Sequence, residues 1–357
     1  MKLNQTWRLV AAFCVLLGAC GDSSNETPDA SVTDAAPPID AAPADPTLLS
    51  SRSLYADIAT KTIASDAVEY SPVYPLWADG AAKQRWIQLP PGTKIDTADM
   101  DHWQFPVGTR MWKEFATPEG KRLETRLIEK LPDGTFFFGA FIWNEAGTDA
   151  KLNLNGASDV LGTMHDVPSK ARCALCHKGE AGRVLGFSAL QLSKDGSGAS
   201  DPTLKSLAAA GLLTVPPPAG VDYRFPGDAT ARAALGYLHA NCGHCHTPDG
   251  TAYKDTCLQA MNGDLSECMQ LQFSVADANG ADPLNSKVMK SLIGTVTHSN
   301  NFPSAPRLTP HMPGMSAIYI RPSQRGGMIQ MPPSFSTEIV DDTGLAAIEA
   351  FINAVPN

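Results

Sequence analysis

The stretch Leu235-Gly-Tyr-Leu-His-Ala-Asn-Cys-Gly-His-Cys-His246 decides how the rest of this chain is interpreted. It ends in the pattern Cys-x-x-Cys-His, formed by Cys242, Cys245 and His246. Two thiols three positions apart can both reach the vinyl groups of one porphyrin, and the imidazole beside the second thiol then becomes the proximal ligand of the iron. The pattern therefore predicts a covalently attached c-type haem. The alternative is a zinc or redox pair that happens to precede a histidine.

A second copy of the pattern lies upstream, at Cys173-Ala-Leu-Cys176-His177. Both copies have the same residue types in the same order, which makes a chance zinc or redox pair a poor explanation. The chain is therefore predicted to bind two covalent haem c groups, with His177 and His246 as the proximal iron ligands.

Length and charge restrict the class of protein. A chain of 357 residues is long enough for two or three units with cores of their own, and a hydrophobic content of 43% is ordinary for a globular protein. The formal net charge of −9 argues against a nucleic-acid partner and against electrostatic attachment to anionic lipid. The acidity fits a basic protein or a small cation as partner, although it also serves solubility alone.

The N-terminus predicts export. Lys2 and Arg8 precede the apolar run 9–19, which has the form of a signal peptide and is too short to cross a membrane. The phrase Leu17-Gly-Ala-Cys20 resembles a bacterial lipobox, so residues 1–20 are predicted to be a lipoprotein signal peptide with Cys20 as the lipidated residue. Ordinary secretion with a stray thiol is the alternative. The absence of Asp after the cysteine, by resemblance to bacterial lipoproteins, favours anchoring in the outer membrane, facing the periplasm or the surface.

The remaining cysteines fit an oxidising compartment. After the haem, lipid and signal-peptide cysteines are assigned, two of the eight are left, Cys257 and Cys268. They are predicted to form a disulfide that closes a short loop, with two free buried thiols as the alternative. Residues 21–47 are rich in Ala, Pro, Asp, Ser and Thr and have almost no large apolar side chains, so they are predicted to be a disordered tether.

Residues 48–165 are predicted to form an antiparallel β-rich domain. The segments 85–89, 109–115, 122–130 and 135–144 suit strands and are separated by Pro and Gly turns, whereas 48–67 is predicted to be helical from the spacing of its apolar residues. The aromatic side chains of this region are expected to be core residues, and a haem-contacting wall is the alternative. They are Trp77, Trp86, Trp103, Trp112, Phe136, Phe138 and Trp143.

The rest of the chain is divided into a first haem-binding segment, 166–225, and a final domain, 226–357. A short helix is predicted within 202–213, and amphipathic helices at 228–239 and 343–355. A haem motif that follows one helix, with a second helix at the C-terminus, resembles a class I cytochrome c domain. The resemblance implies an all-α domain in which Gly236 and Tyr237 meet Phe351 where the two helices cross. The predicted fold class is thus a multidomain α+β protein.

Several phrases together resemble a wider bacterial family of lipidated di-haem c-type cytochromes, which are often encoded near parallel β-helix repeat proteins. The resemblance spans most of residues 48–357 and implies haem binding, electron transfer and a β-helix repeat protein as a neighbour, but neither a substrate nor a distal ligand for the first haem. The phrases are Tyr74-Pro-Leu-Trp-Ala-Asp-Gly80, Leu89-Pro-Pro-Gly-Thr-Lys-Ile95, Phe105-Pro-Val-Gly-Thr109, Leu123-Glu-Thr-Arg-Leu127, Trp143-Asn144, Val221-Asp-Tyr-Arg-Phe-Pro-Gly227 and Tyr237-Leu-His-Ala-Asn-Cys242.

The class I resemblance also implies that the second haem takes a methionine ligand from the loop before the C-terminal helix. Met331 is predicted, because the two prolines that follow it stiffen the backbone, and Met328 is the second choice. Met312 and Met315 are expected to fill the core. For the first haem the candidates are weaker, and each alone is expected to be unligated: Met164, His165, Met111 and His102.

The favoured function is electron transfer between envelope redox proteins, with donor and acceptor unidentified. The alternatives are a di-haem peroxidase or oxidase, or a haem sensor, with an open site at the first haem. The two motifs begin 242 − 173 = 69 residues apart, which departs from two-domain di-haem peroxidases. No acid or base for catalysis can be named, so an electron carrier is predicted rather than an enzyme.

Overall fold

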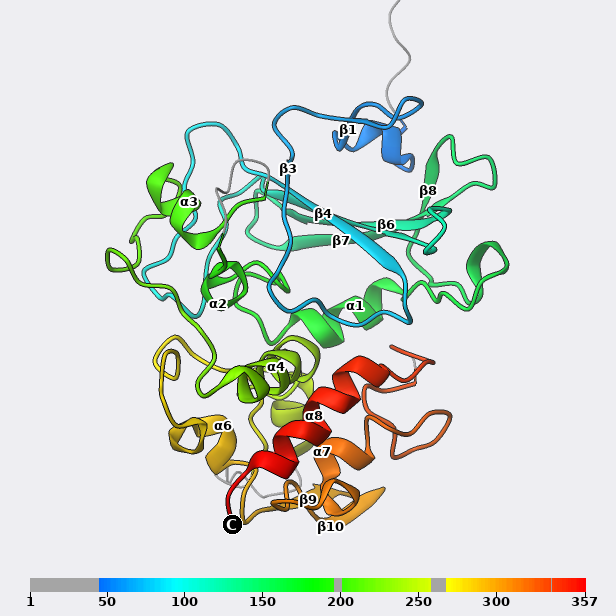
Figure 1. Ribbon diagram of the computed structural model, residues 1–357. Coiled ribbons are helices and arrows are strands. Elements are labelled where there is room, and N and C mark those ends of the chain that lie inside the picture. Colours follow the sequence, from blue (N-terminus) through cyan, green and yellow to red (C-terminus); the bar gives the residue numbers. More distant parts are fainter. Residues whose placement is uncertain (1–44, 196–200, 258–267, 335) are drawn as a thin grey trace, which may run out of the picture. The chain divides into compact units, whose positions relative to one another are not determined.

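Six strands between residues 68 and 153 form one antiparallel sheet in which strand order follows the sequence (Figure 1). The structure is a computed structural model that describes residues 45–195, 201–257, 268–334 and 336–357. The predicted strands are confirmed, since each overlaps a strand of this sheet. The strands are β3 (Val68–Glu69), β4 (Ala82–Gln88), β5 (Arg110–Ala116), β6 (Arg122–Lys130), β7 (Phe136–Trp143) and β8 (Ala150–Asn153).

The two faces of the sheet differ in chemistry because successive side chains point to opposite sides. Trp86, Trp112 and Trp143 lie in one buried cluster, together with Leu54 and Tyr55 from the preceding segment. These three tryptophans are therefore core residues, as predicted from the sequence. The other face carries basic and apolar side chains and forms one wall of a cavity.

The prediction of a helix over 48–67 is wrong. This segment forms a single turn, η1 (Leu49–Ser51), and two short strands, β1 (Tyr55–Asp57) and β2 (Thr62–Ile63), which pair with each other. Ser53 and Lys61 both have φ of 62°, a left-handed conformation that an α-helix excludes.

Among the described residues, four short helical elements lie between the sheet and residue 209. They are η2 (Val160–Gly162), α1 (Lys170–His177), α2 (Ala189–Leu192) and α3 (Leu204–Ala209). Ser169 caps α1 by accepting from the backbone N–H of Arg172. Figure 1 shows α1 between the sheet and the C-terminal helices, and it contacts β7.

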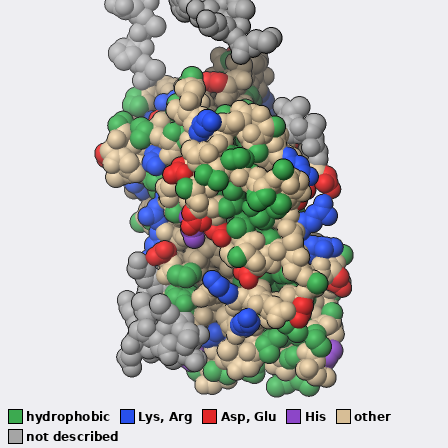
Figure 2. Space-filling view, turned by 90° about the vertical axis from the view of Figure 1, so that its left-hand side faces the viewer, with side chains coloured by type: hydrophobic (Ala, Val, Ile, Leu, Met, Phe, Trp, Pro, Cys, Tyr) green, Lys and Arg blue, Asp and Glu red, His purple; other side chains and the backbone are tan. Residues whose placement is uncertain are grey.

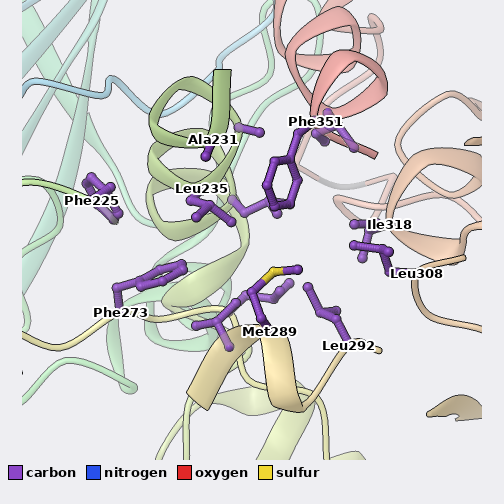
Figure 3. Packing of buried hydrophobic residues seen from close by; sticks show 14 of the residues in the cluster. Phe225, Ala231, Leu235, Phe273, Met289, Leu292, Leu308, Ile318 and Phe351 are labelled. Atoms are coloured by element: carbon purple, nitrogen blue, oxygen red, sulfur yellow. The ribbon is translucent and has the colours of Figure 1, made fainter. Parts of the chain in front are cut away.

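Two amphipathic helices frame the C-terminal part. Asp228 caps α4 (Ala229–Leu238) and Asp341 caps α8 (Asp342–Ala354), each through its carboxylate. The predicted helices at 228–239 and 343–355 are therefore confirmed. Apolar residues of both helices share one buried cluster (Figure 3): Phe225, Ala231, Leu235, Phe273, Met289, Leu292, Leu308, Ile318 and Phe351 are among its members.

The predicted all-α class I cytochrome c domain over 226–357 is wrong, and the described protein is β-rich with few helices. Between α4 and α8 the chain forms a two-stranded sheet and helical pieces of one or two turns, joined by irregular segments rich in Pro and Gly, which interrupt helices. These elements are η3 (His239–Gly243), η4 (Thr251–Cys257), η6 (Pro283–Asn285), α6 (Lys287–Lys290), β9 (Val296–Ser299), β10 (Phe302–Pro306), η7 (Pro313–Met315) and α7 (Ala317–Ile320).

Helices α4 and α8 do pack against each other, and Tyr237 and Phe351 both belong to this packing, but Gly236 does not take its expected place in it. A Cβ on Gly236 would lie 2.3 Å from the ring of Tyr74, so this glycine admits a side chain from the N-terminal half. A Cβ on Gly344 of α8 would lie 2.0 Å from the ring of Tyr237 on α4. The small residue thus stands on the C-terminal helix and the aromatic one on the first helix, the reverse of the predicted pairing.

Residues 45–357 form one compact unit, in which the predicted segments 48–165, 166–225 and 226–357 meet. The predicted signal peptide, Cys20 and residues 21–44 of the predicted tether lie outside the described residues. Within the described ranges, no helix has the length and apolar character needed to cross a membrane.

Candidate functional site

Both Cys-x-x-Cys-His motifs open into the same cavity, whose volume of about 400 Å³ lies in the range of cofactor pockets. Helix α1 carries the first motif and ends at its histidine. Helix α4 continues into the π-helical turn η3, which carries the first cysteine of the second motif. The sheet face with the basic side chains forms another wall. The motif residues that line the cavity are Cys173, Cys176, His177, Cys242, Cys245 and His246.

The two motifs touch each other through their second cysteines. The Sγ atoms of Cys176 and Cys245 and a ring nitrogen of His244 all lie within 4.8 Å of one another. Close backbone approach makes this possible, since a Cβ on Gly179 would lie 2.3 Å from the carbonyl oxygen of His244. Thr251 Oγ1 also donates to the Leu175 carbonyl, 2.5 Å away, and ties the two motif segments together.

Each motif histidine has a backbone hydrogen-bond partner that leaves a ring nitrogen available. The Nδ1 of His177 donates to the backbone carbonyl of Arg183 at 2.7 Å, which leaves Nε2 for a metal, and His246 has a comparable backbone partner in Met269. Such a bond fixes the tautomer and the direction of a ligating imidazole. Burial lowers the pKa of both histidines to about 4, so both rings are neutral at physiological pH.

The four motif thiols are not equivalent. Burial raises the pKa of Cys173, and it raises the pKa of Cys242 to about 12. A hydrogen bond with Cys245, aided by the nearby His244 ring, lowers the pKa of Cys176 to about 4, while the same bond raises the pKa of Cys245. Of these two adjacent thiols, Cys176 is therefore the one that loses its proton more readily.

Cys176, His244 and Cys245 also have the composition of a three-ligand zinc site, the alternative left open by the sequence. The Nδ1 of His244 is buried without a hydrogen-bond partner, which fits a ligand position. Such an ion would use one cysteine from each motif and neither motif histidine. Haem attachment explains all six motif residues, so it accounts for more of the site. Sequence reasoning missed His244, because it occupies an unspecified position of the motif.

The candidate methionine ligands of the second haem differ in whether they line the cavity or are exposed. Met331 lines the cavity, together with the two prolines that follow it, whereas the Met328 side chain is 75% exposed and does not line it. The expectation that Met312 and Met315 fill the core is wrong, because both are exposed on the surface.

Of the four weaker candidates for the first haem, two line the cavity. Met111 on β5 is buried and faces it, and His165 also lines it. Met164 is 56% exposed. His102 binds Asp99 through Nδ1 at 2.8 Å on an exposed part of the surface and does not line this cavity.

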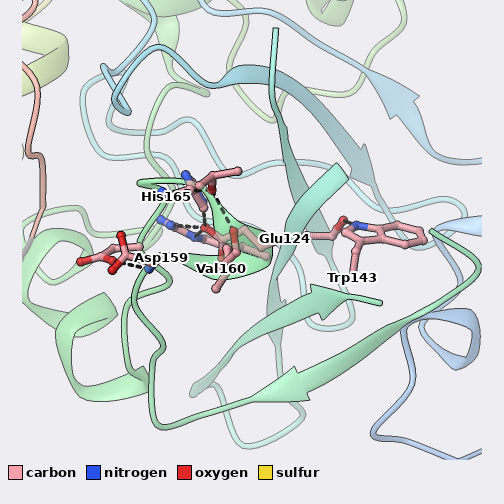
Figure 4. A network of polar contacts seen from close by, with 9 residues as sticks. Glu124, Trp143, Asp159, Val160 and His165 are labelled. Atoms are coloured by element: carbon pink, nitrogen blue, oxygen red, sulfur yellow. Dashed lines mark hydrogen bonds and ion pairs between the residues drawn. The ribbon is translucent and has the colours of Figure 1, made fainter. Parts of the chain in front are cut away.

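His165 is held in a polar network (Figure 4). Its Nε2 donates to Glu124 Oε1 at 2.8 Å, and its backbone carbonyl accepts from Val160. Glu124 also accepts from Arg126 and is fully buried. Burial works to raise the pKa of Glu124, but Arg126 and His165 outweigh it and lower that pKa. Ligation through Nε2 would require His165 to leave this network, so Met111 is the more available of the two.

Cys257 and Cys268 form a disulfide with an S–S distance of 2.05 Å, in agreement with the predicted pair. The loop between them, 258–267, lies outside the described residues. Met269, directly after the disulfide, lines the cavity and contacts His246 through its backbone. Nothing in the sequence pattern distinguished Met269, because its role depends on where the disulfide holds it.

No family model, no curated protein and no solved structure matches this chain. The family resemblance therefore stays a prediction.

Proposed function

We propose that this chain is a di-haem c-type cytochrome that transfers electrons in the bacterial cell envelope, of the lipid-anchored kind that its sequence resembles. The observation that carries the proposal is that both Cys-x-x-Cys-His motifs, far apart in the sequence, open into one mostly apolar cavity of about 400 Å³. A zinc site or an isolated redox pair would not require this convergence of six residues.

In this proposal, each motif binds one of the two haem groups. Cys173 and Cys176 would form the thioethers of one haem, and the second motif would hold the other. The irons, when bound, supply a one-electron couple. His177 and His246 are neutral and oriented by backbone partners, so each presents one nitrogen to its iron at small cost. The apolar walls exclude water, and this influences the reduction potential.

The contact between the motifs favours electron relay inside the chain. Because Cys176 and Cys245 are adjacent, the attachment sites of the two groups are neighbours. An internal relay needs short separations, since electron transfer slows steeply with distance.

The proposal includes export and a lipid anchor at Cys20, with envelope redox proteins as donor and acceptor and a neighbouring β-helix repeat protein as a further partner. One face of the folded part carries acidic and basic side chains interspersed with a group of hydrophobic ones (Figure 2). Such a mixed surface suits transient docking to another protein better than binding to a single charged polymer.

A haem enzyme or sensor is the second candidate, and one observation favours it. The ring nitrogen of His165 nearest Glu124 is occupied by that carboxylate, so this histidine does not supply a ready distal ligand to the first iron. Met111 is the remaining described side chain among the candidates that faces the cavity.

Carbon monoxide distinguishes the two functions. For an electron carrier, we expect the reduced protein to show two six-coordinate haems whose optical spectra do not change on mixing with carbon monoxide. Rapid binding at one haem would instead support a catalytic or sensing role and would contradict the carrier proposal. Stopped-flow spectroscopy of the mature protein, with cyanide added to the oxidised form in parallel, makes the measurement.

Met331 is proposed as the distal ligand of the second haem. Met331→Ala is expected to abolish the weak sulfur-to-iron charge-transfer band, to lower the potential of one haem and to open that iron to carbon monoxide, because a thioether ligand raises the potential. Met328→Ala is the matched control, three residues away and exposed. If the band survives in the first variant and disappears in the second, the assignment is reversed.

A further inference from the structure

Three cations stand side by side across the sheet, on the face that lines the cavity. Arg85 on β4 is paired in register with Lys113 on β5, and Lys113 is paired with Arg126 on β6. All three side chains line the cavity that contains the haem motifs. We call these three residues the cation row.

Among the described residues, only one of the three members of the cation row has a carboxylate partner. Arg126 binds Glu124, but in the described ranges no carboxylate forms an ion pair with Arg85 or Lys113. Arg85 is only 6% exposed. Burial and then the neighbouring Arg85 and Arg126 hold the pKa of Lys113 well below its usual value.

Like charges directly opposite one another in a sheet are destabilising, and so are buried charges without partners. A row of this kind is stable when an anion enters the cavity and binds it. Two unpaired cations therefore indicate a binding site for two negative charges, or for one group that carries both.

The position of the cation row relative to the first motif indicates which anion would bind to it. Arg126 lies near the cysteines of that motif, since the charges of Cys173 and Cys176 act on it, and Lys113 acts on the motif histidine His177. Lys113 lies one strand away from Arg126, and Arg85 lies two strands away, which is about 10 Å at the usual spacing of ~4.8 Å between strands. Next to the row, the ring of Phe138 on β7 lies 5.4 Å from that of His177.

A porphyrin attached to the first motif has its vinyl edge at the two cysteines and its two propionate carboxylates at the opposite edge. We infer that Arg85 and Lys113 bind the propionate carboxylates of the haem attached through Cys173 and Cys176, while Arg126 stays paired with Glu124. Hydrogen bonds between a cation and a carboxylate are short and strong, so they fix the tilt of the group as well as its charge. This inference rests on the proposed function.

The test uses the mature protein and the variants Arg85→Gln and Lys113→Gln. A nearby cation favours the reduced iron, so its loss leaves a propionate unneutralised and lowers the potential. At a fixed potential we expect the reduced-to-oxidised ratio of one haem to fall at least tenfold, which is about 59 mV for one electron. The propionate bands in the resonance Raman spectrum should shift as well.

Arg110→Gln is the matched control. Arg110 lies on the same strand as Lys113 but on the other face of the sheet, where it pairs with Glu129 at 2.9 Å. It should leave both the potential and the Raman bands unchanged. An equal shift in all three variants would mean a general effect of surface charge and would overturn the inference.

Three further outcomes would also overturn it. Arg85 and Lys113 border a second cavity of about 350 Å³, by which a free anion would reach them. If nitrite or bromide produces a saturable change in the wild-type haem spectrum that is lost in Lys113→Gln, the cation row binds a free anion. If both variants keep two haems with unchanged potentials and Raman bands, the propionates lie elsewhere while the proposed function stands. A mature protein without haem would end both proposals.

Discussion

Replacing Cys173 and Cys176 together by alanine is expected to halve the haem content, from two groups per chain to one. Without thioethers this haem is held only by its axial ligands and by contacts in the cavity. The protein should be produced in a host that matures c-type cytochromes. Haem per chain is then measured from the pyridine haemochrome spectrum and from the mass of the intact chain.

The chain offers a matched control for this cysteine experiment. Replacing Cys257 and Cys268 by alanine also removes two cysteines, but these form the disulfide and not a haem motif. That variant should retain both haems. Full haem content in the Cys173 and Cys176 variant, or stoichiometric zinc in the wild-type protein, would contradict the di-haem proposal.

Glu124→Ala is expected to lower the free energy of unfolding by about 3–5 kcal/mol, the usual cost of removing one partner from a buried ion pair. The side chain is fully buried, and its loss leaves Arg126 without its carboxylate and His165 without its acceptor. Denaturant unfolding of wild type and variant measures the difference. Glu129→Ala on the same strand is the control, since its partner Arg110 is about one-third exposed and such pairs contribute ~1 kcal/mol or less.

The Glu124 carboxylate should also make the stability of the folded protein depend on pH in a definite direction. Burial opposes ionisation of Glu124, but Arg126 and His165 lower its pKa in the folded protein. A group with a lowered folded pKa stabilises the protein above its unfolded pKa, about 4.3 for Glu. This stabilisation should be lost as the pH falls from that value through the folded pKa, and Glu124→Ala should lack this part of the acid transition. Equal acid sensitivity in both proteins would contradict the assignment.

Sequence patterns correctly predicted those helices and strands whose formation depends mainly on their own residues. Alternation gave the main strands, and Asp228 with the apolar spacing behind it gave α4. The helix predicted over 48–67 failed because its apolar residues pack against the sheet, with two left-handed residues between them, which spacing alone does not reveal. The all-α C-terminal domain failed for a related reason. The helices at 228–239 and 343–355 were predicted correctly, but the long Pro-rich segment between them was wrongly assigned to the same all-α domain.

The site was partly predictable for the same physical reasons. The motif residues could be named in advance from their spacing, and the disulfide pair from the cysteines left over by the other assignments. Met331 was predicted from the two prolines that follow it, and it lines the cavity, while its role as a ligand stays a prediction. The cation row could not, because Arg85 and Lys113 become neighbours only through the register of β4 and β5. His244 likewise becomes significant only when α1 and η3 bring the two motifs together.

The residues that form the cavity wall bear on whether haem attachment comes before or after folding. Its lining runs from Tyr70 to Glu338, so the pocket closes only when nearly the whole folded part of the chain has assembled. Three of the four motif thiols then have a raised pKa, and in the closed protein they are poor nucleophiles that a maturation enzyme cannot easily reach. For the di-haem protein proposed above, haem would therefore have to be joined to the newly exported, still open chain. The sheet and the C-terminal helices would then close around haem groups that are already attached.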